Sequence, residues 1–224
     1  MTTFLLAFTA LFSIVNPLSS AFIFYSVTQG FEPRLRAKLS RWVAIYAFAI
    51  VAASLYVGAY VLSFFGVSVP VLRVAGGIVI AMSGWRMLSG PDATEQRKTD
   101  TTAAVPNAAP PSRLAFYPFT MPLTTGPGTI SVAISIGANR PNGVMAAFEF
   151  FGETILAVLL LAVLIYLSYR QSARLAKAIG PTGTIVVVRL TAFLLFCIGI
   201  QIAWSGAFQL LSTLPFTGVP PTPN

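Results

Sequence analysis

Hydrophobic residues occur along this chain in long runs, which short polar connections separate. Six runs are long enough to cross the ~30 Å hydrocarbon core of a bilayer, which takes about 20 residues of helix. They cover residues 4–27, 42–65, 69–88, 114–138, 144–169 and 185–211, to within a few residues. Lipid offers the backbone no hydrogen-bond partners, and the runs do not alternate between polar and apolar positions, so we expect helices. The pattern predicts an all-α membrane protein with six transmembrane helices.

Composition agrees with this prediction and limits the chemistry. Of the 224 residues, 56% are hydrophobic and 9% are charged, whereas soluble domains contain roughly 25% charged residues. The chain has no histidine, a single cysteine at Cys197, and only six carboxylates. A disulfide within the chain and a histidine-ligated metal site are therefore excluded. We expect no enzymatic activity, no cofactor and no metal.

Positive charge follows the connections between the apolar runs, and this predicts the topology. The net charge is +8, but the basic residues are distributed along the chain and do not form a single patch, so we expect no nucleic-acid partner. Lys and Arg concentrate at the first, third and fifth connections, which predicts that these connections are cytoplasmic and that both termini lie outside. Ser19 and Ala21 resemble a signal-peptide cleavage site, but no basic residue precedes the apolar stretch. We therefore expect the first helix to be retained.

A polar segment divides the chain into two halves. Residues 90–113 are rich in Pro, Thr and Ala, which predicts a disordered cytoplasmic linker. The first half, 1–89, and the second half, 114–212, would each hold three helices, and 213–224 would form a flexible tail on the outer side. Because three is an odd number, the two halves are expected to be inserted with opposite orientations.

Two sequence matches relate the halves. Residues 17–21 resemble residues 122–126, and residues 78–84 resemble residues 200–206. The offsets are 105 and 122 residues, so the second half would contain 17 additional residues between its matches. Both matches occur in the same order and in corresponding runs. They predict two inverted three-helix repeats, an architecture that is common among secondary transporters.

Helix breakers lie near the middle of the first and fourth runs. Asn16 can cap a new helix that begins at Pro17. In the fourth run Gly126 can cap a helix that begins at Pro127, and Gly128 would leave the backbone accessible to a ligand. Two interrupted helices in corresponding positions are the best pointer in a sequence to a transporter site. The alternative is a pair of ordinary proline kinks.

The breaks define a candidate substrate site without net charge. Free amides at the start of each half-helix, including those of Leu18, Ser19 and Ser20, would bind a carboxylate, and freed carbonyls would bind an ammonium group. The candidate substrate-binding residues are Asn16, Pro17, Ser19, Ser20, Thr124, Thr125, Gly126, Pro127, Gly128 and Thr129.

Two further features inside the runs each allow two interpretations. Glu153 is an intramembrane carboxylate, which is either a coupling or ammonium-binding group or part of an ion pair with a cation such as Arg73. Small residues form one stripe in the third run and another in the sixth; we expect them to pack the two halves together, and a homo-oligomer is the alternative. Cys197 is expected to be buried, and Trp42, Tyr117 and Tyr169 to lie in the interfacial belts. The stripes are Gly77, Ala81 and Gly84, and Gly199, Ala203 and Gly206.

Three motifs resemble the MarC family, which is related to neutral amino acid transporters of the lysine-exporter superfamily. They are Phe12-x3-Asn16-Pro17, Arg73-x2-Gly76-Gly77 and Pro122-x3-Gly126-Pro127-Gly128-Thr129-Ile130. The resemblance implies a multi-pass protein of the bacterial inner membrane, with periplasmic termini, that moves small neutral amino acids as a secondary transporter or exporter. A membrane scaffold or regulatory protein without transport activity is the alternative.

Overall fold

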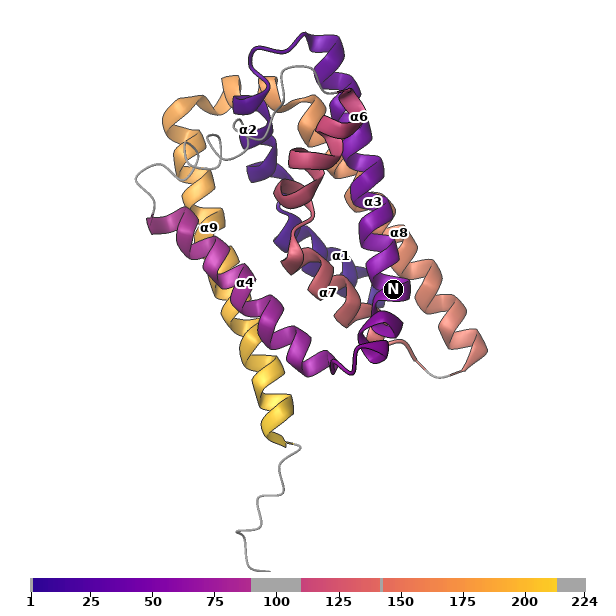
Figure 1. Ribbon diagram of the computed structural model, residues 1–224. Helices are drawn as coiled ribbons and strands as arrows, with labels where there is room; N and C mark the ends of the chain where they lie inside the picture. Colours follow the sequence, from indigo (N-terminus) through magenta and orange to yellow (C-terminus); the bar gives the residue numbers. More distant parts are fainter. Residues whose placement is uncertain (1, 90–109, 142, 213–224) are drawn as a thin grey trace, which may run out of the picture.

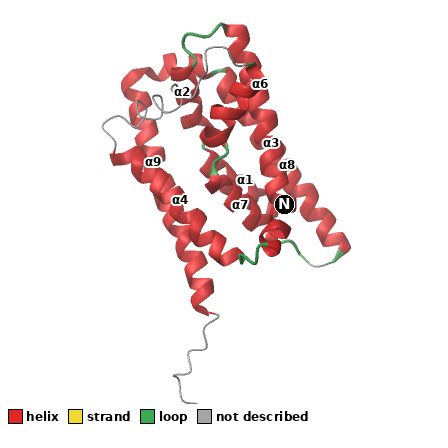
Figure 2. Cartoon of the chain, in the orientation of Figure 1, coloured by secondary structure: helices red, strands yellow, loops and turns green. Residues whose placement is uncertain are grey.

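The computed structural model describes residues 2–89, 110–141 and 143–212, so most of the expected linker and the whole expected tail lie outside the described residues. Within those ranges the chain forms helices and no strands (Figure 2). The elements are α1 (Thr2–Val15), α2 (Pro17–Val27), α3 (Pro33–Phe64), α4 (Val69–Ser89), α6 (Pro111–Leu114), η1 (Ala115–Thr124), α7 (Pro127–Ala138), α8 (Val144–Arg170) and α9 (Ser172–Ser212). The prediction of an all-helical protein is confirmed.

Among the described residues, five helical stretches are long and apolar enough to cross a membrane. They are Thr2–Val27, which joins α1 and α2, then Pro33–Phe64, Val69–Ser89, Val144–Arg170 and Thr182–Ser212. The fourth expected span, 114–138, is no continuous helix, because it is divided into the distorted π-helical segment η1 and the 12-residue helix α7. Five of the six expected spans are therefore recognised by length and hydropathy, although the first is interrupted at Asn16, and the fourth run is divided into two separate elements.

Most helix boundaries lie close to the predicted ones, but α3 begins at Pro33, nine residues before its apolar run. Proline suits the first turn of a helix, where its missing N–H costs nothing. The basic residues that follow remain helical, and Arg36 donates to the carbonyl oxygens of Thr28 (2.8 Å) and Phe31 (3.4 Å). The α2–α3 turn is thus held by a side chain of the first basic connection.

The two broken helices occupy the middle of the molecule (Figure 1). They lie between α3 and α8 on one side and α4 and α9 on the other. α1 contacts α7 and α8, and α2 contacts η1, α8 and α9. Enclosure is greatest around α2, in which every residue of 19–24 is buried. The two helices that are broken at Asn16 and before Pro127 therefore form the centre of the fold, and α3, α4, α8 and α9 surround them.

α4 and α9 pack as an antiparallel pair through their small residues. A Cβ on Gly77 would lie 2.4 Å from the Ala203 nitrogen, and a Cβ on Gly199 would lie 2.3 Å from the Ala81 nitrogen. Such distances leave no room for a side chain, so the two backbones are in direct contact. The predicted packing between the two halves of the chain is confirmed.

α9 contains a kink at Gly180, whose φ of 73° is easily adopted only by glycine. The residues before the kink form a short helical segment at the end of the molecule where α2 and α3 are joined, and the residues after it form the long helix beside α4 (Figure 1). By contrast, only residues 65–68 separate α3 from α4. The second half thus has a helical segment without a counterpart in the first.

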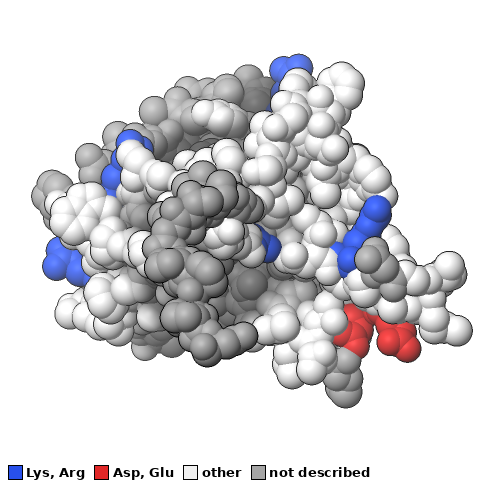
Figure 3. All heavy atoms as spheres, turned by 90° about the horizontal axis from the view of Figure 1, so that it is seen from below, with Lys and Arg blue, Asp and Glu red and all other residues white. Residues whose placement is uncertain are grey.

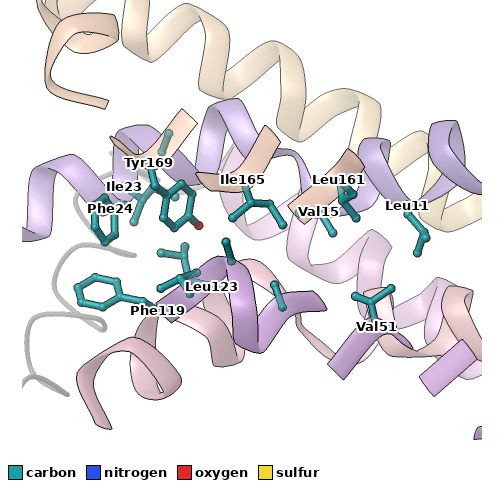
Figure 4. Close-up of a cluster of buried hydrophobic side chains, with 14 of the residues drawn as sticks. Leu11, Val15, Ile23, Phe24, Val51, Phe119, Leu123, Leu161, Ile165 and Tyr169 are labelled. Carbon is teal, nitrogen blue, oxygen red and sulfur yellow. The ribbon is translucent and has the colours of Figure 1, made fainter. Parts of the chain in front are cut away.

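Two placements predicted from the sequence are wrong. Tyr169 is fully buried, and its ring stacks on Phe24 with 4.6 Å between centroids, so it lies in the core and not in an interfacial belt (Figure 4). Cys197 is exposed on α9 and not buried. Both errors have one cause: these helices are apolar all round, so their sequence does not distinguish the inward face from the lipid-facing one.

Candidate functional site

The first break is built around Asn16, which adopts a left-handed conformation (φ 46°, ψ 67°). Asparagine tolerates this region better than most side chains do. Its Oδ1 accepts a hydrogen bond from the Ser19 amide at 3.3 Å, and α2 begins at Pro17. The predicted cap and helix start are present in the structure.

Two of the backbone amides that were expected to be free at the start of α2 already have hydrogen-bond partners. The Ser19 amide is bound by the Asn16 side chain, and the Ser20 amide donates to the Asn16 carbonyl at 3.1 Å. The expectation that both amides are free for a ligand is therefore wrong, because the Asn16 side chain and carbonyl complete this turn.

The two serines after the break differ in their hydrogen bonding. The Ser20 hydroxyl donates to the Val15 carbonyl at 3.2 Å. The Ser19 hydroxyl is buried, in a residue only 2% exposed, and none of the described residues is its hydrogen-bond partner. A buried hydroxyl left unsatisfied costs about 1–3 kcal/mol. Ser19 therefore presents an unused polar group at the start of α2.

The second break is spread over three prolines. Tyr117 and Met121 leave the helical region, with ψ of 122° and 126°, and Gly126 is extended with ψ of 178°. Each of these residues precedes a proline, whose ring disfavours the helical conformation at the residue before it. α7 begins at Pro127. Pro127, like Pro17, is thus the first residue of a helix after a break, whereas the sequence-matched Pro122 lies within η1.

Threonines hold the unwound backbone at the second break. The Thr124 hydroxyl lies 2.6 Å from the Phe119 carbonyl and 2.7 Å from the Tyr169 hydroxyl. The Thr125 amide and hydroxyl both bond to the Thr120 carbonyl, at 2.8 and 3.2 Å. Sequence reasoning missed Tyr169, because nothing in the apolar run around it indicates that it faces inward.

Gly128 serves packing between helices. A Cβ at this position would lie 2.3 Å from Cγ1 of Ile80 on α4. The expectation that Gly128 opens the backbone to a ligand is therefore wrong, since the space beside it is filled by Ile80. Thr129, the next residue, is 2% exposed.

Arg73 connects three helices beside this region. Its Nε donates to the Ser135 hydroxyl on α7 at 2.5 Å, and its Nη1 donates to Oε1 of Gln209 on α9 at 2.8 Å. One turn before Ser135, the Ser131 hydroxyl donates to the Leu72 carbonyl at 3.1 Å. These serines were missed among the candidate residues, although an arginine inside an apolar run already indicates that polar partners lie nearby.

Glu153 belongs to α8, and its side chain reaches the start of α1. Its Oε2 accepts a hydrogen bond from the Phe4 amide at 3.0 Å. A carboxylate there satisfies an otherwise unpaired amide and complements the positive end of the helix dipole. Arg73 is bound to Ser135 and Gln209, so Glu153 and Arg73 have different partners.

The structure places both breaks in the interior of the protein. The four hydroxyl residues Ser19, Ser20, Thr124 and Thr129 are each no more than 4% exposed, and Thr125 is fully buried. α1 lies against α7, and α2 lies against η1, so the two interruptions occur where the paired half-helices meet. Within the described residues, no group of three or more His, Cys, Asp or Glu could hold a metal ion. The site is polar, uncharged and closed.

Comparisons with known proteins agree with this architecture. The family described as MarC family integral membrane protein matches residues 1–211. The UPF0056 inner membrane protein MarC of Escherichia coli (strain K12) is 31% identical over 214 residues, which are 93% of this chain and 95% of that relative. The protein of the same name from Shigella flexneri shows the same identity and coverage. No solved structure matches significantly. With five membrane-length apolar helices and a family match over nearly its whole length, this chain belongs to the MarC family of integral membrane proteins.

Proposed function

We propose that this protein is a secondary transporter of small neutral amino acids, working as an exporter or an importer, and that it binds its substrate between the two helix breaks. The observation that carries the proposal is the Ser19 hydroxyl, which is buried at the start of α2 without a hydrogen-bond partner among the described residues. A substrate oxygen or ammonium group at this position would satisfy it. The paired breaks support the proposal, because broken helices at corresponding positions form the sites of many transporters.

The chemistry of the breaks favours a ligand without net charge. A zwitterion inside the membrane needs a partner for each charge, because an unpaired charge costs several kcal/mol there. The start of α7, which has no side-chain cap, suits its carboxylate, and the carbonyls of the unwound residues 121–125 suit its ammonium group. All the polar side chains at the breaks are uncharged, so a cationic or anionic amino acid would lack a partner for its side chain.

We assign Glu153 the role of a residue that couples transport to a proton. It bonds to Phe4 at the start of α1, which is 12 residues before Asn16 and therefore about 18 Å from the break along the helix. That distance argues against contact with the substrate ammonium group. Protonation of Glu153 would weaken its hold on α1, and this would connect the movement of one broken helix to a proton.

We also propose that the two halves are inverted repeats with both termini outside. The α4–α9 contacts support this, because Gly77 meets Ala203 and Ala81 meets Gly199, and an offset of 122 residues converts either pair into the other. The offset between the breaks, Pro17 to Pro127, is 110. The longer helix α9, with 41 residues against 21 in α4, accommodates the difference.

Reporter fusions test the orientation. A reporter fused after Asn224 should be active only in the periplasm, and one inserted at Thr101 only in the cytoplasm. Figure 3 views the molecule from the end opposite the α2–α3 turn; cationic side chains are scattered over this view, mostly near its outline, and carboxylates gather at one side. The opposite reporter pattern would overturn both the topology and the inverted repeat.

Transport into proteoliposomes tests the function. Labelled glycine and alanine should show saturable flux under an imposed proton or sodium gradient, whereas labelled lysine and glutamate should not. Ser19→Ala should reduce the flux at least tenfold while leaving the protein as stable as wild type or more so, because it removes an unsatisfied hydroxyl. Ser20→Ala is the matched control: it deletes the same group one residue later, where the hydroxyl is already bonded to Val15. Absence of flux in the wild-type protein would favour the scaffold or regulatory function.

A further inference from the structure

A groove of about 490 Å³ runs along the seam between α4 and α9. Its floor contains the small residues Ala81 and Ala203, and its walls contain larger apolar side chains. Gly76 and Ile80 of α4 face α7, where they pack against Ser131 and Gly128. Ile78, two residues from each of them, points the opposite way. The groove therefore opens on the surface that faces the surrounding lipid, away from the broken helices.

Both halves of the chain build this groove. Ten of its eleven lining residues form pairs separated by 122 residues, the offset that relates α4 to α9. The pairs are Val74 and Phe196, Ile78 and Ile200, Ala81 and Ala203, Met82 and Trp204, and Trp85 and Ala207. The eleventh residue, Arg86, would pair with Phe208, so only one end of the groove carries a cation. The groove is thus apolar along its length and polar at one end.

We propose that the groove binds an acyl chain of an anionic phospholipid whose phosphate pairs with Arg86. The 12 residues of helix from Arg86 to Val74 span about 18 Å, close to the roughly 15 Å of hydrocarbon in one leaflet. Arg86 is exposed, and no described residue forms an ion pair or hydrogen bond with its guanidinium. Arginine matches phosphate geometry through paired N–H donors. Trp85, which is 57% exposed, lies beside it, where tryptophan meets the lipid headgroups.

The length and the single charged end favour a lipid over a second copy of this chain. An acyl chain needs an apolar channel about one leaflet deep with its headgroup at one end, and the groove provides both. A second copy would have to cover Arg86 together with the apolar walls, and it would leave that cation without a partner. The occupant is therefore a single phospholipid of the leaflet on the Arg86 side.

Tryptophan fluorescence measures this binding directly, because two of the three tryptophans, Trp85 and Trp204, line the groove. Single-tryptophan proteins are reconstituted into phosphatidylcholine bilayers that contain phosphatidylglycerol with bromine on its acyl chain, and quenching is compared with brominated phosphatidylcholine. The anionic lipid should quench Trp85 with about fivefold preference, the effect of one basic residue near a membrane surface. Arg86→Gln should reduce that preference to about one. Arg174→Gln removes a cation outside the groove at the same end of the molecule and should leave it unchanged.

Bromine depth provides a second readout. Ala203 packs against Gly77, so Trp204 lies about nine residues of α4, or about 13 Å, deeper than Trp85. Bromines near the headgroup should quench Trp85 most strongly, and bromines near the chain end should quench Trp204 most strongly. Equal quenching by the two lipids, or a preference that survives Arg86→Gln, would overturn the proposal. Shielding of both tryptophans from either lipid, with crosslinking between copies through Cys197, would replace the lipid by a second copy of the chain.

Discussion

The two helix breaks differ in how the chain leaves the helical conformation. At the first break a single residue interrupts the helix: Asn16 adopts a left-handed conformation, and its side chain caps α2. At the second, residues before three prolines are forced out of the helix, and Gly126 provides no side-chain cap for α7. The first break depends on a single side chain, whereas the second depends on covalent ring geometry at several positions. Single substitutions should therefore damage the first break more than the second.

The largest loss should follow Asn16→Leu. Leucine in a left-handed conformation costs about 1–2 kcal/mol, and loss of the cap costs about 1 kcal/mol more, so the free energy of unfolding should fall by about 2–3 kcal/mol. Denaturation in detergent measures the change. Asn16→Gly is the control, because glycine adopts this conformation freely and loses only a few tenths of a kcal/mol of capping. Equal losses in both variants would mean that the conformation of Asn16 does not sustain the break.

Gly128→Leu tests whether the second break is limited by packing against α4. The new side chain would collide with Ile80, and such overpacking costs about 1–3 kcal/mol. Ile80→Ala in the same protein should recover part of the stability by making room. If the double variant is no more stable than Gly128→Leu alone, Ile80 does not define the space beside Gly128.

A double-mutant cycle between Thr124→Val and Tyr169→Phe tests the cross-link from the second break to α8. The two hydroxyls are 2.7 Å apart, and a buried hydrogen bond contributes about 0.5–1.5 kcal/mol. The coupling energy in thermal or chemical unfolding should fall in that range. Additive effects would show that the Thr124 hydroxyl is held by the Phe119 carbonyl alone.

The smallest effect should come from Pro127→Ala. Its ring restricts the unfolded chain and occupies a helix position that needs no N–H, so its loss should cost about 0.4–1 kcal/mol of unfolding free energy. The other two prolines still interrupt η1. A loss as large as that of Asn16→Leu would show that Pro127 alone maintains the second break, and the contrast between the two breaks would disappear.

The sequence predicted the helices and their interruptions better than the faces they present. Asn16-Pro17 and Gly126-Pro127 carry local backbone rules, and these are legible without a structure. The match between the halves does not by itself show which of the three nearby prolines begins the helix after the second break, and the structure identifies Pro127 as the first residue of α7. The inward face of Tyr169 depends on which helices surround α8. A helix that is apolar all round has no polar face, so its sequence does not show which side packs against other helices and which side faces lipid.

The contact between α4 and α9 also has a consequence for how the protein is made. Gly77 and Gly199 are 122 residues apart in the chain, and synthesis at about 5–20 residues per second separates their appearance by about 6–24 s. During that interval the glycine face of α4 has no partner and rests against lipid or another protein. α4 can therefore make its packing contacts with α9 only after the last part of the chain has been synthesised and inserted. Truncation before α9 should leave α4 with an open seam, however well the preceding helices have inserted.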